Sequence, residues 1–270
     1  MKRILFLLII GMATGLMADI KVSDFINHKQ CDKVYSTSIY DSCYDYNHKG
    51  TTAVSYTIKF KDVYRKNIRK RPRWVSPSGI DAEYIPTNSD YYKNKKKYNK
   101  GHLANDASFD YDARVLKQTY ILGVNAVPQD RKVNKNNWAK AEIFTRDLTK
   151  IYKTIHILDI VHYGKETIGK HRIGVPDYFY KVVIIPKRGT MCFKYSNNPL
   201  TYKRSDTLFE HLVPCSTIRP AHKEKVVHAA KKKYKSEHKT HTHTYTKNND
   251  VSSSKGTYSI KDLQDHFNNR

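Results

Sequence analysis

The pattern of apolar and polar positions predicts several strands and one well-defined helix in the middle of the chain. Residues 52–62 alternate between apolar and polar side chains and are rich in β-branched and aromatic residues, which predicts a strand. The apolar runs at residues 155–163 and 178–185 predict buried strands. Residues 134–148 predict a helix, because their apolar side chains fall at helical spacing, at positions 138, 141, 144 and 148.

Other segments set the limits of the folded region. Residues 120–127 predict a buried strand that ends at Pro128, and residues 63–101 are irregular and interrupted by prolines. Residues 216–270 contain runs of lysine, of alternating histidine and threonine, and of serine, with few apolar positions. That composition predicts a basic, mostly disordered C-terminal tail. We therefore expect a single α+β domain over residues 19–215.

The N-terminus has the layout of a secretory signal. Lys2 and Arg3 precede an apolar run from Ile4 to Met17, and the small residue Ala18 precedes the first acidic residue. A run of about 14 apolar residues is short for a membrane span. We expect residues 1–18 to be a signal peptide, a periplasmic or extracellular location, and no stable membrane association after its removal. An uncleaved anchor or a core helix are the alternatives.

The four cysteines form two groups along the chain. An even number of cysteines in a secreted chain favours disulfides. We predict local pairing of Cys31 with Cys43 and of Cys192 with Cys215. Free buried thiols are the alternative, and a four-cysteine zinc site is disfavoured because no CxxC spacing is present.

The net charge indicates which kind of partner the domain binds. The chain has 49 Lys+Arg and 25 Asp+Glu, a formal charge of +24, and a hydrophobic content of 39% that is ordinary for a folded protein. Residues 216–270 hold only 12 of these basic and 5 of these acidic residues, so the folded domain is itself basic. A mean hydropathy of −0.71 excludes a polytopic membrane protein. The positive charge indicates a polyanionic partner, either nucleic acid or an anionic membrane surface.

Three groups of polar residues could together hydrolyse a phosphodiester. That reaction needs a base, a cation that stabilises the leaving oxygen, and donors that hold the phosphate. Taken singly the residues are weak signals, since a lone histidine is commonly structural and an asparagine that opens a helix is commonly a cap. Their order and spacing carry the signal: Lys100-Gly101-His102, then Asn125 after a predicted strand, then Asn134, Trp138 and Glu142 on one face of the predicted helix.

In this order the chain resembles the DNA/RNA non-specific endonucleases of the ββα-metal class. The family pattern is Asp-Arg-Gly-His-Leu-Ala, then Asn-x-x-Pro-Gln, then Asn with Trp four and Glu eight residues later. The chain reads Asn99-Lys100-Gly101-His102-Leu103-Ala104, Asn125-Ala126-Val127-Pro128-Gln129, and Asn134 with Trp138 and Glu142. Segments 54–58 and 175–182 match core strands, so the resemblance covers about residues 50–190. It implies the ββα-metal (His-Me finger) nuclease fold, with a central antiparallel sheet flanked by helices.

The resemblance also implies a role for each residue. His102 would be the general base, which suits an imidazole with an ordinary pKa of about 6.5. Asn134 would be the sole protein ligand of Mg²⁺, with Mn²⁺ able to substitute, and Glu142 would hydrogen-bond water molecules of the metal. Asn125 would orient the site near His102. The expected substrates are DNA and RNA, and the expected products carry 5′-phosphates.

Two departures from the family pattern concern phosphate binding. Asn99 and Lys100 stand where the family has Asp and Arg, and lysine keeps the positive charge but lacks the bidentate fork of arginine. These changes bear on rate and pH optimum. The family also has a phosphate-binding arginine upstream, for which Arg73 is the first choice and Arg71 the second. Solvated charges in a basic loop are the alternative reading of these arginines.

A lysine run directly precedes the histidine motif. Lys93, Lys95, Lys96 and Lys97 lie among tyrosines. They form either a solvated face or a sequence-independent contact with the nucleic-acid backbone.

The leading hypothesis is a secreted or periplasmic, Mg²⁺-dependent, non-specific endonuclease. The alternative is a catalytically impaired basic protein of the same fold that binds or takes up nucleic acid, for which the Asn99-Lys100 variant is the support. A toxin effector is disfavoured, because the simple signal is not accompanied by a delivery domain. The sequence predicts neither an oligomeric state nor an inhibitor partner.

Overall fold

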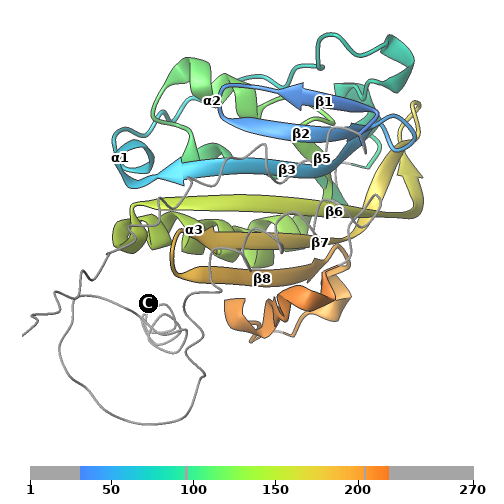
Figure 1. Cartoon of the computed structure of the whole chain (residues 1–270). Coiled ribbons are helices and arrows are strands. Elements are labelled where there is room, and N and C mark those ends of the chain that lie inside the picture. The colour runs from blue at the N-terminus through green and yellow to red at the C-terminus, as the bar shows by residue number, and fades with distance from the viewer. Residues whose placement is uncertain (1–30, 95–96, 204, 219–270) are drawn as a thin grey trace, which may run out of the picture.

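A seven-stranded antiparallel sheet forms the centre of the molecule (Figure 1). This computed structural model describes residues 31–94, 97–203 and 205–218. The predicted signal, nearly all of the predicted tail, and Lys95 and Lys96 lie outside the described residues. The sheet has the order β1-β2-β3-β6-β7-β8-β9, with strands Lys33–Ser36, Tyr40–Asp45, Gly50–Lys59, Thr154–Ile168, Ile173–Ile185, Gly189–Ser196 and Leu212–Val213.

The central strands β6 and β7 are buried on both faces. Ile157 pairs with Val183 and faces one side of the sheet, while the next pair, Leu158 with Val182, faces the other. Because side chains alternate along a strand, such burial produces an apolar run and not an alternating pattern. This explains why both strands were predictable from apolar runs alone.

Helix α3 (Ala139–Tyr152) covers one face of the sheet, behind it in the view of Figure 1. Its residues Ala141, Phe144 and Leu148 join Trp138 in the main core cluster. A π-helical turn at Val133–Trp138 leads into α3, so the predicted helix is confirmed and extends to Tyr152. The remaining helices are short: α1 (Phe60–Val63), α2 (Ala113–Thr119), and 3-10 turns at Ala82–Tyr84, Asn88–Tyr91, Asp106–Ser108, Pro199–Thr201, Leu208–His211 and Cys215–Thr217.

A two-stranded ribbon lies on the same side of the sheet as α3. It consists of β4 (Tyr98–His102) and β5 (Ala126–Asp130), and Leu103 and Val127 connect it to the main core. The prediction of a strand that ends at Pro128 was wrong, because β5 begins at Ala126 and runs through this proline. Likewise the strand predicted to reach residue 62 ends at Lys59, where the chain turns into α1.

The register of the ribbon explains why Pro128 is tolerated. Arg131 N donates to Lys97 O and Leu103 N donates to Asn125 O, each at 3.0 Å. Hydrogen-bonded pairs therefore alternate along the ribbon, and Pro128 opposite Lys100 occupies a non-hydrogen-bonded pair. The missing N–H of the proline would have pointed away from β4, so its absence costs no ladder bond.

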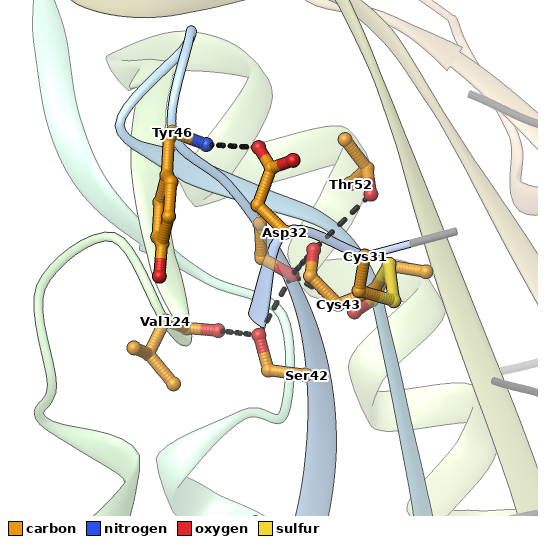
Figure 2. Close-up of a disulfide and its surroundings, with 9 residues drawn as sticks. Cys31, Asp32, Ser42, Cys43, Tyr46, Thr52 and Val124 are labelled. Atoms are coloured by element: carbon orange, nitrogen blue, oxygen red, sulfur yellow. Dashed lines mark hydrogen bonds between the residues drawn. A yellow bond between two sulfur atoms is a disulfide. The ribbon is translucent and has the colours of Figure 1, made fainter. Parts of the chain in front are cut away.

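Two disulfides lie near the two edges of the sheet, and both predicted pairings are confirmed. Cys31 bonds Cys43 of β2, and Cys192 of β8 bonds Cys215. Figure 2 shows the first of them, beside Ser42, whose hydroxyl donates to the Val124 carbonyl at 2.7 Å. This hydrogen bond ties β2 to the loop that leads into β5. Among the described residues no helix has the length and apolar character needed to cross a membrane.

Candidate active site

His102 ends β4, and its imidazole packs against two aromatic rings that also contact each other. Ring centroids of Trp74 and Tyr120 lie 4.7 Å and 4.8 Å from that of His102. Its Nε2 atom is buried without a hydrogen-bond partner in the described part of the chain. Burial lowers the pKa of His102 to about 4, against the opposing attraction of Asp106. The imidazole is therefore neutral at pH 7 and has a ring nitrogen free to accept a proton, once the tautomer places the hydrogen on Nδ1.

Side-chain donors hold the backbone carbonyls at the end of β4. Trp138 Nε1 donates to the His102 carbonyl at 3.1 Å, and the Tyr56 hydroxyl donates to the Leu103 carbonyl at 3.2 Å. Both donors are fully buried in the core. The position of the imidazole is thus fixed by groups from β3 and from the turn before α3.

Asn125 holds the next residue of the same segment. Its Oδ1 accepts from Ala104 N at 2.8 Å, and its Nδ2 donates to the carbonyls of Ala104 and Thr119 at 2.9 and 2.8 Å. All of these bonds go to the backbone, and the side chain is completely buried. The geometry suits the expected orienting role and leaves Asn125 no contact with a substrate.

The glycine before His102 is required by close packing. A Cβ atom at Gly101 would lie 2.2 Å from Oε1 and 2.5 Å from Cβ of Gln129. The contact with Cβ of Gln129 cannot be relieved by moving a flexible side-chain end. Any larger residue at position 101 would push β4 away from β5 and displace the imidazole.

Asn134 and Glu142 lie on the helical segment that faces the ribbon. Asn134 is in the π-helical turn, a conformation frequent at functional sites, and is partly buried. It forms no side-chain hydrogen bond within the described residues, so its amide oxygen is free for a ligand. Burial raises the pKa of Glu142 to about 8, against the attraction of Lys181 and Arg146.

Asp106 connects the two sides of the site, and the sequence did not single it out. Its charge acts on the pKa of both His102 and Glu142, so it lies within electrostatic reach of both. It accepts a hydrogen bond from the Tyr120 hydroxyl at 2.6 Å. Although burial alone would raise it, the pKa of Asp106 is lowered by His102, Tyr120 and Arg71.

Of the two candidate arginines, Arg71 is the one whose charge acts on the pKa of His102. Its Nε lies 3.1 Å from Asp106 Oδ2 and its Nη2 lies 3.1 Å from Asp110 Oδ2. Arg73, the first choice from sequence, is exposed and has no ion pair in the described chain. Arg71 is thus pre-positioned at the site by two carboxylates.

Arg146 is a second site residue that sequence reasoning missed. It lies one helical turn after Glu142, and the two side chains interact electrostatically. Its Nη1 atom is buried without a hydrogen-bond partner among the described residues. A buried guanidinium nitrogen without an acceptor is the kind of donor that a phosphate oxygen would satisfy. The i, i+4 spacing from Glu142 was the signal that could have identified it.

A buried ion pair lies beneath the site. Lys181 Nζ is 2.7 Å from Asp159 Oδ1, and both side chains are completely buried. The same Nζ lies 3.3 Å from the Tyr56 hydroxyl and 4.2 Å from the centroid of the Trp138 ring. Lys181 therefore contacts both of the side chains that hold the end of β4.

The predicted phosphate-binding lysines occupy different environments. Lys100 and His102 are two residues apart on β4, so their side chains face the same side of the ribbon. Its Nζ donates to Asn88 Oδ1 at 2.5 Å and lies 5.8 Å from the centroid of the Trp74 ring. Lys97 Nζ instead pairs with Glu166 Oε1 at 3.0 Å, and Lys93 is exposed.

The donor set suits a hard, water-rich cation better than zinc. Within the described residues there is no group of three or more His, Cys, Asp or Glu side chains that could hold a metal ion. An amide oxygen with carboxylates nearby matches the oxygen ligands of Mg²⁺, which keeps several waters when bound. The site therefore fits the expected single ligand, Asn134.

Known proteins resemble the chain in both sequence and fold. The family model described as DNA/RNA non-specific endonuclease matches residues 25–235. Human mitochondrial endonuclease G is 26% identical over 166 residues, covering 57% of this chain and 55% of that protein. The mitochondrial nuclease EXOG of Xenopus laevis is 26% identical over 164 residues, covering 54% and 43%. The chain thus spans about half the length of the curated relatives it matches.

A solved structure supports the assignment of the fold. The crystal structure of an EndoG/EndoGI complex matches with a TM-score of 0.61 and 21% identity, covering 71% of this chain and 82% of that one. The expected α+β, ββα-metal nuclease fold is confirmed.

Proposed function

Because the chain belongs to the DNA/RNA non-specific endonuclease family, we propose that it cleaves DNA and RNA internally by hydrolysis of phosphodiester bonds. The observation that carries this proposal is the neutral, partly buried His102 with a buried, unpartnered Nε2, next to the helical segment that bears Asn134 and Glu142. An endonuclease needs a base that is already deprotonated where the phosphate binds, and this arrangement supplies it.

His102 is the general base of the proposed reaction. Its neutral imidazole takes a proton from the attacking water as the water approaches phosphorus. The aromatic rings of Trp74 and Tyr120 restrict the orientation of the imidazole. Asn125 and Trp138 act through the backbone and keep the imidazole in place.

Arginine side chains hold the phosphate. The unpartnered Nη1 of Arg146 donates to a non-bridging oxygen, and Arg71, fixed by Asp106 and Asp110, adds its positive charge within electrostatic reach of His102. Lys100 adds a charge on the same face of the ribbon. Burial lowers the pKa of Lys100, so its environment is already partly shielded from water.

Asn134 would hold the divalent metal through its amide oxygen. We propose Mg²⁺, with Mn²⁺ able to substitute, because an oxygen ligand and a water-rich site are what these ions accept. When bound, the metal supplies positive charge to the phosphate and to the 3′-oxygen as it leaves. Glu142 accepts hydrogen bonds from waters at that position, and the products carry 5′-phosphates.

The proposed location is the periplasm or the exterior of the cell. Support comes from the signal-like residues 1–18 and from the two disulfides, since disulfides persist in oxidising compartments. The relatives named above are mitochondrial nucleases. The proposal for this chain therefore rests on its own N-terminus and cysteines.

One assay distinguishes the proposed nuclease from the alternative, a nucleic-acid-binding protein without activity. Supercoiled plasmid is incubated with the purified protein in Mg²⁺, in EDTA, and in Mg²⁺ with the His102→Ala variant. Cleavage that requires Mg²⁺ and His102 supports the nuclease. His162→Ala is the matched control, because His162 contacts Tyr178 on the opposite face of the sheet. Binding without cleavage by the wild-type protein would favour the alternative.

A further inference from the structure

A basic cavity lies beside the first turns of α3 and is not part of the site described above. Its volume is about 720 Å³, within the range of pockets that hold ligands. It lies between the helical segment 132–143 on one side and residues 199–203 with Asp206 on the other. Its charged lining residues are the lysines at positions 132, 135, 140 and 203 and a single carboxylate, Asp206.

One carboxylate offsets only part of the charge of four lysines, and its side chain is held by the protein. Asp206 Oδ2 accepts from Asn137 Nδ2 at 2.5 Å, and Asp206 Oδ1 lies 2.8 Å from His211 Nε2. Its side chain is only 8% exposed. Lys132, Lys135 and Lys203 are exposed and form no ion pair in the part of the chain that the structure describes. The cavity therefore presents excess positive charge to solvent.

The cavity also offers apolar surface beside the charge. Ile143 is 50% exposed, and the cavity wall opposite it includes Pro199 and Tyr202. The neighbouring Leu200 is 87% exposed. Lysines that contact phosphates, together with apolar and aromatic surface for sugars and bases, are the combination that binds a polynucleotide strand without regard to sequence.

The position of the cavity links it to the catalytic site. Lys135 directly follows Asn134 in the π-helical turn, so the edge of the cavity begins one residue from the proposed metal ligand. The same holds further along α3, where two consecutive residues serve the two sites: Glu142 faces the catalytic site and Ile143 lines the cavity. A strand held at Asn134 has only to cross this turn to reach the lysines.

We propose that this cavity is a second binding site for the nucleic-acid substrate, which holds phosphates several nucleotides away from the bond that is cleaved. This inference rests on the proposed nuclease function. The lysines contact the backbone, and Ile143, Pro199 and Tyr202 contact sugars and bases. The cavity makes cleavage depend on substrate length, because a short ester cannot reach from Asn134 into it.

The test compares a long substrate with a short one. The triple variant Lys132→Gln, Lys140→Gln and Lys203→Gln removes three charges from the cavity and leaves Lys135 and the π-helical turn unchanged. The control variant removes three exposed lysines elsewhere, Lys61, Lys117 and Lys187. Both are assayed on a 20-nucleotide DNA and on bis(p-nitrophenyl) phosphate, which is too short to occupy the cavity.

The cavity variant should raise KM for the 20-nucleotide DNA about tenfold or more, and hydrolysis of bis(p-nitrophenyl) phosphate should stay at the wild-type rate. Its slope of log affinity against log salt should be flatter by about 2 to 3, at about 0.7–0.9 per lost phosphate contact. The control variant should change both quantities far less. Equal changes in the two variants, or a loss of activity on the short ester, would overturn the proposal.

A binding experiment separates this proposal from the proposed function. Fluorescence anisotropy with a labelled 20-nucleotide DNA in EDTA measures affinity without cleavage. If the wild-type protein cleaves nothing but the cavity variant still binds at least tenfold more weakly than the control, the binding site stands and the nuclease function falls. If the protein cleaves DNA and the affinities of both variants are equal, the binding site falls alone.

Discussion

Replacement of Lys181 by Met would test whether the buried ion pair supports both the fold and the catalytic base. The substitution keeps the length of the side chain and removes the charge. Asp159 would then be left with the Tyr56 hydroxyl, 3.3 Å away, whose single proton is shared with the Leu103 carbonyl. Removing one member of a buried pair costs about 3–5 kcal/mol, because the remaining charge is left buried and unpaired. We expect a loss of unfolding free energy of this size at pH 8.

The pH dependence of this loss has a defined sign. Burial raises the pKa of Asp159 to about 6 even with Lys181 present, above the value of about 3.9 in an unfolded chain. A carboxyl with a raised folded-state pKa stabilises the fold when protonated, and that stabilisation is lost as the pH rises through the folded pKa. Without Lys181 the folded pKa rises further. The cost of Lys181→Met should therefore be smaller at pH 5 than at pH 8.

Urea unfolding at the two pH values measures the stability effect, and steady-state kinetics measures the positioning effect. Since Tyr56 and Trp138 hold the carbonyls beside His102 and both contact Lys181, kcat should fall while KM for DNA changes little. Lys181→Met with Asp159→Leu should regain most of the stability, because it leaves no unpaired charge. A single variant as stable as the wild type at pH 8, or a cost that is greater at pH 5, would refute the reasoning.

Three further outcomes follow from the site and the cross-links. His102→Ala should lower kcat by about 10²–10⁴-fold, while DNA affinity measured by fluorescence anisotropy stays unchanged. In the wild type, burial lowers the pKa of His102 to about 4. A pH–rate profile should therefore show full base function at pH 5.5 and a decline only near pH 4. EDTA should abolish cleavage but barely move Tm in calorimetry, and Asn134→Ala should do the same, because one amide ligand contributes little folding energy; a large shift in Tm would indicate a structural metal. Reduction of the two disulfides should lower the free energy of unfolding by about 2–4 kcal/mol for each bond, and Tm should therefore fall clearly. An unchanged Tm would contradict their structural role.

Residues close together in the sequence were the predictable part of the site. The Gly101-His102 pair was found from the family pattern, and the helical spacing of Asn134 and Glu142 follows from local periodicity. The two disulfide pairs were also predictable, because each joins cysteines that are near neighbours in the sequence.

Contacts between distant segments were not predictable. Arg71 meets Asp106 only because the proline-interrupted loop returns to the ribbon, and no sequence period encodes that return. Asp159 and Lys181 lie directly opposite each other on β6 and β7, but each is a single charged residue within an apolar run. The register between two strands had to be known before the pair could be recognised.

The prediction of a strand that ends at Pro128 failed for a related reason. Pro128 suggested the end of a strand because it cannot donate a hydrogen bond, yet it occupies a position where no donor is needed. Whether a proline ends a strand depends on which side of the partner strand it faces. That is a property of the pair and not of either segment alone.

The two disulfides have a consequence for how the molecule comes apart. Cys31 and Cys43 join the chain before β1 to β2 at one edge of the sheet, and Cys192 and Cys215 join β8 to the chain after β9 at the other. Edge strands are the part of a sheet that frays first and offers its backbone to other chains. With both edges covalently tied, partial opening gives a protease or a second sheet little to engage, so survival among proteases depends on how slowly the whole domain unfolds.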